Sequence, residues 1–161
     1  MNTLHQSQTN WPVWVAALVM SLAVVAPVQA QSRYAYSADG SEVTDAQTGL
    51  IWRRCTVGQT WSNGTCTGGL TVFRHEEALA HAMTQSGWRL PNVKELASLV
   101  DTSSARPAVN VTAFPGTPTA TYWSSTPDVQ LPSSAWSIDF GSGVVASTGR
   151  NTFGVLARLV R

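Results

Sequence analysis

The fold is decided by the stretch from Gly87 to Asp101, Gly-Trp-Arg-Leu-Pro-Asn-Val-Lys-Glu-Leu-Ala-Ser-Leu-Val-Asp. Pro91 keeps the residue before it away from helical angles, so a strand-like segment ends there. Asn92 is a good helix N-cap, and Glu95 three residues later can accept a hydrogen bond from the Asn92 amide, as in a capping box. The apolar residues that follow share one helical face: Val93, Leu96, Ala97 and Val100. The stretch therefore predicts a proline turn and a short helix ending near Asp101, and it contains no catalytic group.

Helix and strand patterns also flank this stretch. Upstream, the segment from Phe73 to Gln85 places four apolar side chains on one face of a predicted helix: Ala78, Leu79, Ala82 and Met83. Downstream, the apolar period changes to two from Thr121. Ala135 to Phe140 is the clearest strand, a turn follows at Gly141-Ser142-Gly143, and a last strand is predicted from Phe153 to Val160. Two helices and several short strands are therefore expected.

Two cysteines, Cys55 and Cys66, lie beyond the apolar N-terminal segment. In an exported protein, an isolated pair that closes a short loop is typical of a disulfide rather than of a redox or metal site. Between them stands Asn63-Gly64, the strongest two-residue signal for a hairpin turn. We therefore expect a disulfide that closes a small hairpin or loop.

Residues 1–30 have the pattern of a signal peptide. From Trp11 to Val28 the chain is mostly Val, Ala, Leu and Met, and the small-residue pattern Val28-Gln29-Ala30 suits cleavage after Ala30. A retained membrane anchor is the alternative. We expect residues 31–161 to form a single domain with no stable membrane span after signal removal. Its expected location is the periplasm, the cell surface or the medium.

The charge of the chain is nearly balanced. All ten basic and nine acidic residues lie beyond residue 30, so the net charge of that part is +1. Nucleic-acid binding usually requires a concentrated basic face, and this balance does not predict one. We therefore expect no nucleic-acid partner.

Several ordered motifs resemble those of one known family. They are Asp45-x-x-Thr48-Gly49-Leu50-Ile51-Trp52, Trp88-Arg89-Leu90-Pro91 with Glu95-Leu96, Tyr122-Trp123-Ser124-Ser125, Trp136 to Phe140, and a terminal Val-x-x-Arg-x-Val-Arg. Together they span about residues 39–161. They resemble the C-terminal domain family of Legionella collagen-like adhesins, long catalogued as a domain of unknown function.

The resemblance implies an α+β, C-type-lectin-like fold. Two helices would lie beside a twisted, mostly antiparallel sheet, and the first and last strands would pair so that the termini meet. The same fold class includes formylglycine-generating enzymes and phage receptor-binding proteins, so the fold alone does not determine the function.

Reactive patterns in the chain are incomplete. His75 and His81 would be separated by about 240° around a helix, whereas a zinc helix carries its histidines at i and i+4, so we expect exposed helix histidines. Ser124-Ser125 lacks a Gly-x-Ser-x-Gly elbow. The calcium motifs of sugar-binding C-type lectins do not occur, and both cysteines precede the C-terminal half where formylglycine-generating enzymes carry their reactive cysteines. We therefore expect no enzymatic activity, no cofactor and no metal.

Five tryptophans lie beyond residue 30. Trp52, Trp88 and Trp136 each stand in a motif of the family and in an apolar pattern, so we expect them in the core. Trp61, on the disulfide loop, is the tryptophan most expected at the surface. For Trp123 the sequence does not decide between a core position and a ligand contact.

A structural role is expected for three residues of the stretch from Gly87 to Asp101. Pro91 sets the turn and Glu95 completes the cap. Arg89 is expected to donate to loop carbonyls or to a carboxylate such as Asp101, which would hold the helix in place.

Polar residues after Thr121 form the candidate recognition surface. Arg150-Asn151 lies in the polar connection before the last predicted strand, where related binding folds display ligand contacts. The complete candidate set is Trp123, Asp128, Gln130, Ser137, Asp139, Arg150 and Asn151. We expect an exported, non-catalytic recognition or adhesion module that binds a glycan or a surface protein. The alternatives are a structural or assembly subunit of a surface appendage or envelope complex and, third, an enzyme related to formylglycine-generating enzymes.

Overall fold

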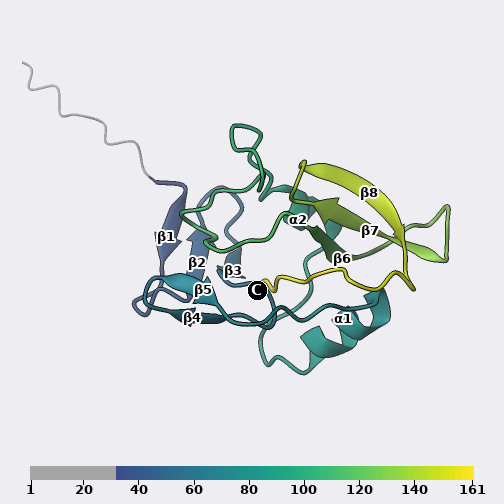
Figure 1. The fold of residues 1–161 in the computed structure, drawn as a ribbon, viewed down its shortest axis with the longest axis horizontal. Coiled ribbons are helices and arrows are strands. Elements are labelled where there is room, and N and C mark those ends of the chain that lie inside the picture. The colour runs from purple at the N-terminus through teal and green to yellow at the C-terminus, as the bar shows by residue number, and fades with distance from the viewer. Residues whose placement is uncertain (1–31) are drawn as a thin grey trace, which may run out of the picture. The chain divides into compact units, whose positions relative to one another are not determined.

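Two helices and three antiparallel sheets make up residues 32–161, the part of the chain that this computed structural model describes (Figure 1). The expected α+β class is confirmed, and the predicted signal peptide, residues 1–30, lies outside the described residues. The first sheet contains, in order, β1 (Tyr34–Tyr36), β2 (Glu42–Asp45) and β3 (Ile51–Arg53). The second is a hairpin of β4 (Thr60–Ser62) and β5 (Thr65–Thr67). The third contains β6 (Thr121–Pro127), β7 (Ser134–Asp139) and β8 (Val144–Gly149). The helices are α1 (His75–Met83) and α2 (Val93–Ala97).

The helix α2 begins at the predicted cap. The side chain of Asn92 accepts from the Glu95 amide at 2.9 Å, and the Glu95 carboxylate accepts from the Asn92 amide at 2.8 Å. The helix ends at Ala97, earlier than the predicted end near Asp101. Val100 instead forms an isolated antiparallel bridge with Val109, and this bridge requires extended backbone. Neither α1 nor α2, the helices of the described part, has the length and apolarity that crossing a membrane requires.

Arg89 binds a different carboxylate from the one suggested by the sequence. Its two terminal nitrogens donate to the two Glu95 oxygens at 2.7 and 2.8 Å, in a bidentate pair. Asp101 instead accepts from the amide and hydroxyl of Ser103. Glu95 therefore joins the segment before Pro91 to the start of α2.

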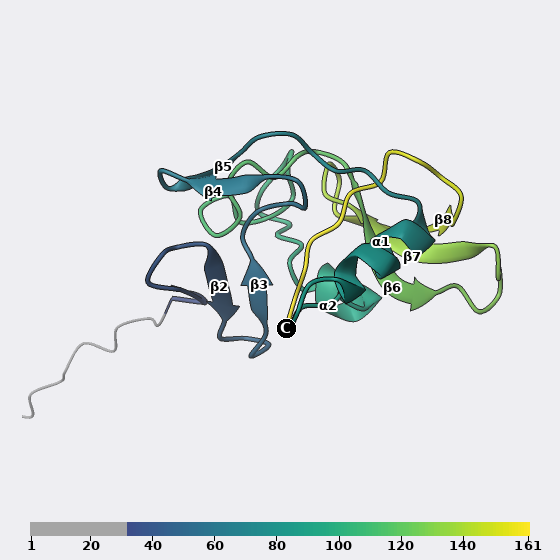
Figure 2. The same ribbon diagram turned by 90° about the horizontal axis from the view of Figure 1, so that it is seen from below.

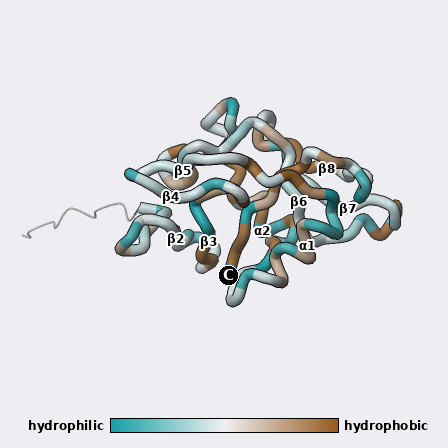
Figure 3. Tube along the Cα trace, turned by 60° about the horizontal axis from the view of Figure 1, so that its bottom comes forward, coloured by the Kyte–Doolittle hydropathy of each residue, from teal (hydrophilic) through white to brown (hydrophobic). Residues whose placement is uncertain are grey.

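The C-terminal segment, residues 155–161, links the first and third sheets (Figure 2). The amide of Leu156 donates to the carbonyl of Thr121 on β6 at 2.9 Å. Further along, Arg161 and Ile51 of β3 exchange two hydrogen bonds of 2.9 Å. The segment is hydrophobic along most of its length, as its brown colour near the C label shows (Figure 3).

The expected pairing of the first and last strands is wrong. β1 pairs with β2, and the last residues pair with β3 and with Arg89, because the order β1-β2-β3 places β3 on the side of the first sheet that meets the C-terminal segment. The predicted strand from Phe153 to Val160 consists of isolated bridges, since the segment changes partner along its length.

The tryptophans divide between buried and partly exposed positions. Trp52 and Trp123 have 0% of their surface exposed. Trp88 and Trp136 are only partly buried, contrary to the expected core positions. Trp88 packs against the edge of a hydrophobic cluster, and its ring also lies beside two guanidinium groups, 4.9 Å from Arg53 and 4.7 Å from Arg161.

The predicted disulfide and hairpin are both present. Cys55 and Cys66 are bonded, with their Cα atoms 5.3 Å apart. β4 and β5 pair around Asn63 and Gly64, whose φ angles of 50° and 80° are those of the expected hairpin turn. The disulfide therefore attaches this hairpin to the end of β3.

Candidate functional site

A cavity of about 650 Å³ lies where the start of α1 meets the segment after β8. Two groups of residues line it. The helix side contributes Arg74, His75, Glu76, Glu77, Leu79 and Ala80. The loop side contributes Ser133, Arg150 and Asn151. Two residues of the candidate recognition surface, Arg150 and Asn151, therefore border this cavity.

Arg150 is held in place by backbone hydrogen bonds on both sides. Its amide donates to Ser133 O at 2.8 Å, and its carbonyl accepts from the His75 amide at 3.0 Å. Its Nε also donates to Ser134 O at 3.1 Å. Among residues 32–161, its two terminal nitrogens donate to no other group. The fold thus fixes the base of the guanidinium and leaves its donating end available at the cavity.

The acidic residues of α1 give the cavity a mixed charge. Glu77 accepts from the amide of Arg74 at 2.7 Å and from its guanidinium at 3.2 Å. The Arg74 amide, with help from the Arg74 charge, lowers the pKa of Glu77. Glu76 is exposed beside this pair. The cavity can therefore offer cationic donors and carboxylate acceptors to one ligand.

His75 is buried at the base of α1, with 1% of its surface exposed, so the expectation of an exposed histidine here is wrong. Its Nε2 lies 3.0 Å from Ser124 O, and its ring meets Trp123 edge to face at 5.1 Å. Burial lowers the pKa of His75, and the charge of Arg150 acts in the same direction. The ring is therefore neutral at neutral pH and belongs to the structural support of the cavity.

The loop between β6 and β7 contains two further candidate residues. Asp128 is 5% exposed, accepts from the Gln130 amide at 3.0 Å, and accepts from the Ser147 hydroxyl at 2.6 Å. The Ser147 hydroxyl is the main reason that the pKa of Asp128 is lowered. Gln130 is exposed on the same loop, which ends at Ser133 of the cavity wall. Asp128 shapes the loop, and neither Asp128 nor Gln130 lines the cavity.

The other three candidate residues do not join this surface. Trp123 is fully buried, and its indole N–H donates to Phe73 O at 3.1 Å. Ser137 is also fully buried, with its hydroxyl 2.7 Å from that of Thr148. Asp139 lies at the far end of β7, where it accepts from the Gly141 amide at 2.8 Å and fixes the β7–β8 turn. Their polar atoms are used inside the fold.

Sequence reasoning did not associate the α1 side of the cavity with Arg150. Arg74 and Glu76 stand at the start of the helix predicted from Phe73 to Gln85, and Ser133 precedes the strand predicted from Ala135. Their separation from Arg150 along the chain leaves no local signal of contact. The sequence indicated only that Arg150 and Asn151 lie in a polar connection before the last predicted strand, and it did not indicate which element packs beside them.

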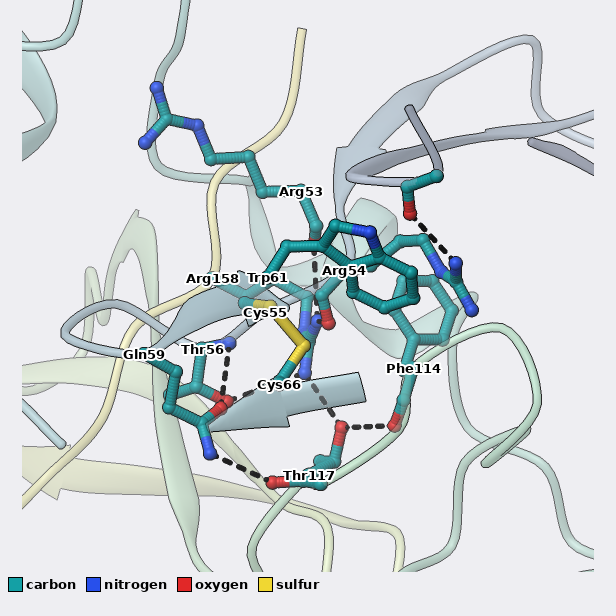
Figure 4. Close-up of a disulfide and its surroundings, with 12 residues drawn as sticks. Arg53, Arg54, Cys55, Thr56, Gln59, Trp61, Cys66, Phe114, Thr117 and Arg158 are labelled. Carbon is teal, nitrogen blue, oxygen red and sulfur yellow. Dashed lines mark hydrogen bonds between the residues drawn. A yellow bond between two sulfur atoms is a disulfide. The ribbon is translucent and has the colours of Figure 1, made fainter. Parts of the chain in front are cut away.

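A second polar cluster surrounds the disulfide and is structural (Figure 4). Arg158 is fully buried; it donates to the carbonyls of Arg53 and Arg54 and, at 2.7 Å, to the Thr117 hydroxyl. Arg54 stacks on the ring of Trp61 at 4.0 Å. Trp61 is partly buried, as Trp88 and Trp136 are.

The described residues show no metal centre: within 32–161, no three His, Cys, Asp or Glu side chains gather closely enough to hold an ion.

Comparison with known proteins gives one match. Residues 41–161 match the family model described as the Lcl C-terminal domain, which confirms the resemblance seen in the motifs. No curated protein and no solved structure matches the chain.

Proposed function

We propose, since the chain belongs to the Lcl C-terminal domain family, that it is an exported, non-catalytic recognition module with a C-type-lectin-like fold. Its ligand is a glycan or a protein of a cell or matrix surface, and its place of action is outside the cytoplasm. The family match supports an adhesion-related role.

The observation that carries the proposal is the geometry of Arg150 at the 650 Å³ cavity. A binding site needs polar groups held in position before the ligand arrives, because ordering them on binding reduces affinity. Three hydrogen bonds hold the backbone and Nε of Arg150, while its terminal nitrogens stay available.

The rest of the cavity suits a hydroxyl-rich or peptide-like ligand. Asn151 adds an amide that can both donate and accept, and Glu76 adds an acceptor. Leu79 and Ala80 supply apolar surface on the helix side. Because most of the lining is polar or charged, a ligand with many hydrogen-bonding groups suits the cavity better than an apolar one.

The test is a glycan array together with a pull-down from cell-envelope extract, using folded protein. We expect one ligand class to be retained, and Arg150→Ala to weaken its binding at least tenfold. Lys94→Ala is the matched control, because Lys94 is an exposed cation on α2 outside the cavity. Blank results in both assays, or equal loss in both variants, would reject the proposal.

A further inference from the structure

The strand β8 presents one hydrogen-bonded edge and one open edge. Six of its residues pair in regular antiparallel register with β7, from Val144 opposite Asp139 to Gly149 opposite Ser134. Among residues 32–161 no strand pairs with its other edge, and β8 is the outermost strand of the third sheet (Figure 1).

The register shows which backbone groups are free. In an antiparallel pair, alternate residues direct their N–H and C=O groups to the partner strand. Arg150, directly after β8, donates its amide toward β7 at Ser133. The residues at even positions therefore face β7, and Val145 and Ser147 direct their N–H and C=O groups outward.

This edge lacks the features that prevent most sheet edges from pairing with another chain. Natural edge strands usually carry a charge, a proline or a bulge that prevents pairing with another chain. From residue 140 to 149 the chain has no charged residue and no proline, and the β7–β8 register is unbroken. Val144 and Val145 are 55% and 43% exposed.

We propose that the open edge of β8 pairs with the same edge of a second copy of this chain. An antiparallel arrangement about a twofold axis at Ala146 places Val145 of each copy opposite Ser147 of the other. The outward N–H and C=O groups of both residues are then paired, in an interface that uses the same patch on both copies. No like charges oppose each other, since the strand carries none.

A second copy fits this edge better than an unrelated peptide. Peptide recognition by strand addition takes its specificity from pockets that receive alternate side chains beside the edge. No residue of β8 lines the Arg150 cavity or any of four further cavities found in residues 32–161. A self-complementary edge needs no such pocket. The pairing involves other residues than the Arg150 cavity and stands independently of the proposed ligand binding.

Sedimentation equilibrium at increasing protein concentration tests the pairing. We expect a mass of two chains at high concentration and one chain at low concentration. Val145→Pro removes one outward N–H while leaving the β7 bonds in place, and Val145→Lys places like charges across the axis; both should remain monomeric. Val111→Lys is the matched control, because Val111 is 53% exposed and belongs to no strand, and it should dimerise normally.

Amide hydrogen exchange separates edge pairing from association through another surface. In the dimer, the amides of Val145 and Ser147 should exchange at least tenfold more slowly than in the monomer. Circular dichroism and thermal melting establish that each variant is folded. A protein that stays monomeric at every concentration, a dimer with unprotected amides at these two positions, or a dimer unaffected by both Val145 variants would each overturn the proposal.

Discussion

The guanidinium of Arg158 donates to the hydroxyl of Thr117 at 2.7 Å, inside a core that gives the cation no carboxylate. None of the ion pairs formed within residues 32–161 includes Arg158. Its charge is met instead by the carbonyls of Arg53 and Arg54 and by the ring of Phe114, 4.7 Å away. The planar group therefore connects the C-terminal segment to the end of β3 and to the loop before β6.

Arg158→Lys should destabilise the protein although it preserves the charge. One lysine nitrogen cannot donate to the Arg53 carbonyl and to Thr117 on the other side, so a buried partner stays unpaired. We expect the free energy of unfolding to fall by about 2–4 kcal/mol, measured by urea denaturation. Arg53→Lys is the control, since its guanidinium is not fully buried, and it should change the stability by about 1 kcal/mol or less. Equal effects in both variants would contradict the role assigned to Arg158.

Trp52 and Trp88 should respond differently to truncation. Trp52 is fully buried, so Trp52→Ala should reduce the free energy of unfolding by about 3–5 kcal/mol. Trp88 is partly exposed and stacks on two cations, so Trp88→Ala should cost about 1–2 kcal/mol. Urea denaturation followed by circular dichroism measures both, and a larger loss for Trp88→Ala would show that this residue is a core tryptophan after all.

Removing the disulfide should reduce the stability of the fold, because the unfolded chain then gains conformational entropy. Cys55 and Cys66 are 11 positions apart, and closure of such a loop stabilises by about 3 kcal/mol in the chain-entropy description. The double variant Cys55→Ala, Cys66→Ala should therefore lose about this amount in urea denaturation. Alkylation of both cysteines in the native, oxidised protein would show that the bond is absent in solution.

His75 should make the protein less stable as the pH falls below 6.5. Its folded pKa is lowered from 6.5 by burial, so the unfolded chain takes up a proton at a higher pH than the folded one. Between 6.5 and the folded pKa, the unfolded state binds more protons, and the free energy of unfolding decreases with decreasing pH. Above this window the effect is absent.

His75→Gln is the matched variant for this pH dependence. Its side-chain amide can still donate toward Ser124 O, and it does not titrate. Its stability should vary less than that of the parent protein between pH 6.5 and about 5, where carboxylates begin to contribute. If the free energy of unfolding changes equally with pH in both proteins, His75 is not the cause of the pH dependence.

Local signals predicted the parts of the fold that depend on neighbouring residues. The cap at Asn92, the turn at Asn63-Gly64 and the strand β7 all follow from chemistry within a few positions. The partner of the C-terminal segment did not follow, because a pairing between Ile51 and Arg161 leaves no mark in either short stretch. The prediction that Trp88 is a core residue was wrong for the same reason, since the arginines beside its ring come from distant positions in the sequence.

The candidate site was predicted in part. Arg150 and Asn151 border the cavity, whereas Trp123 and Ser137 are buried beneath the strands. Alternation along β6 and β7 did not reveal this, because both faces of these strands contain buried residues. Period-two patterns distinguish a buried face from an exposed one only when one face meets water.

The link formed by residues 155–161 has a consequence for the order of folding. A chain is synthesised from its N-terminus, so the first and third sheets are complete in sequence before the segment that joins them exists. The bonds to Thr121 and Ile51 form only after the last residues emerge. The first and third sheets therefore cannot be joined through this segment until residues 155–161 have been synthesised.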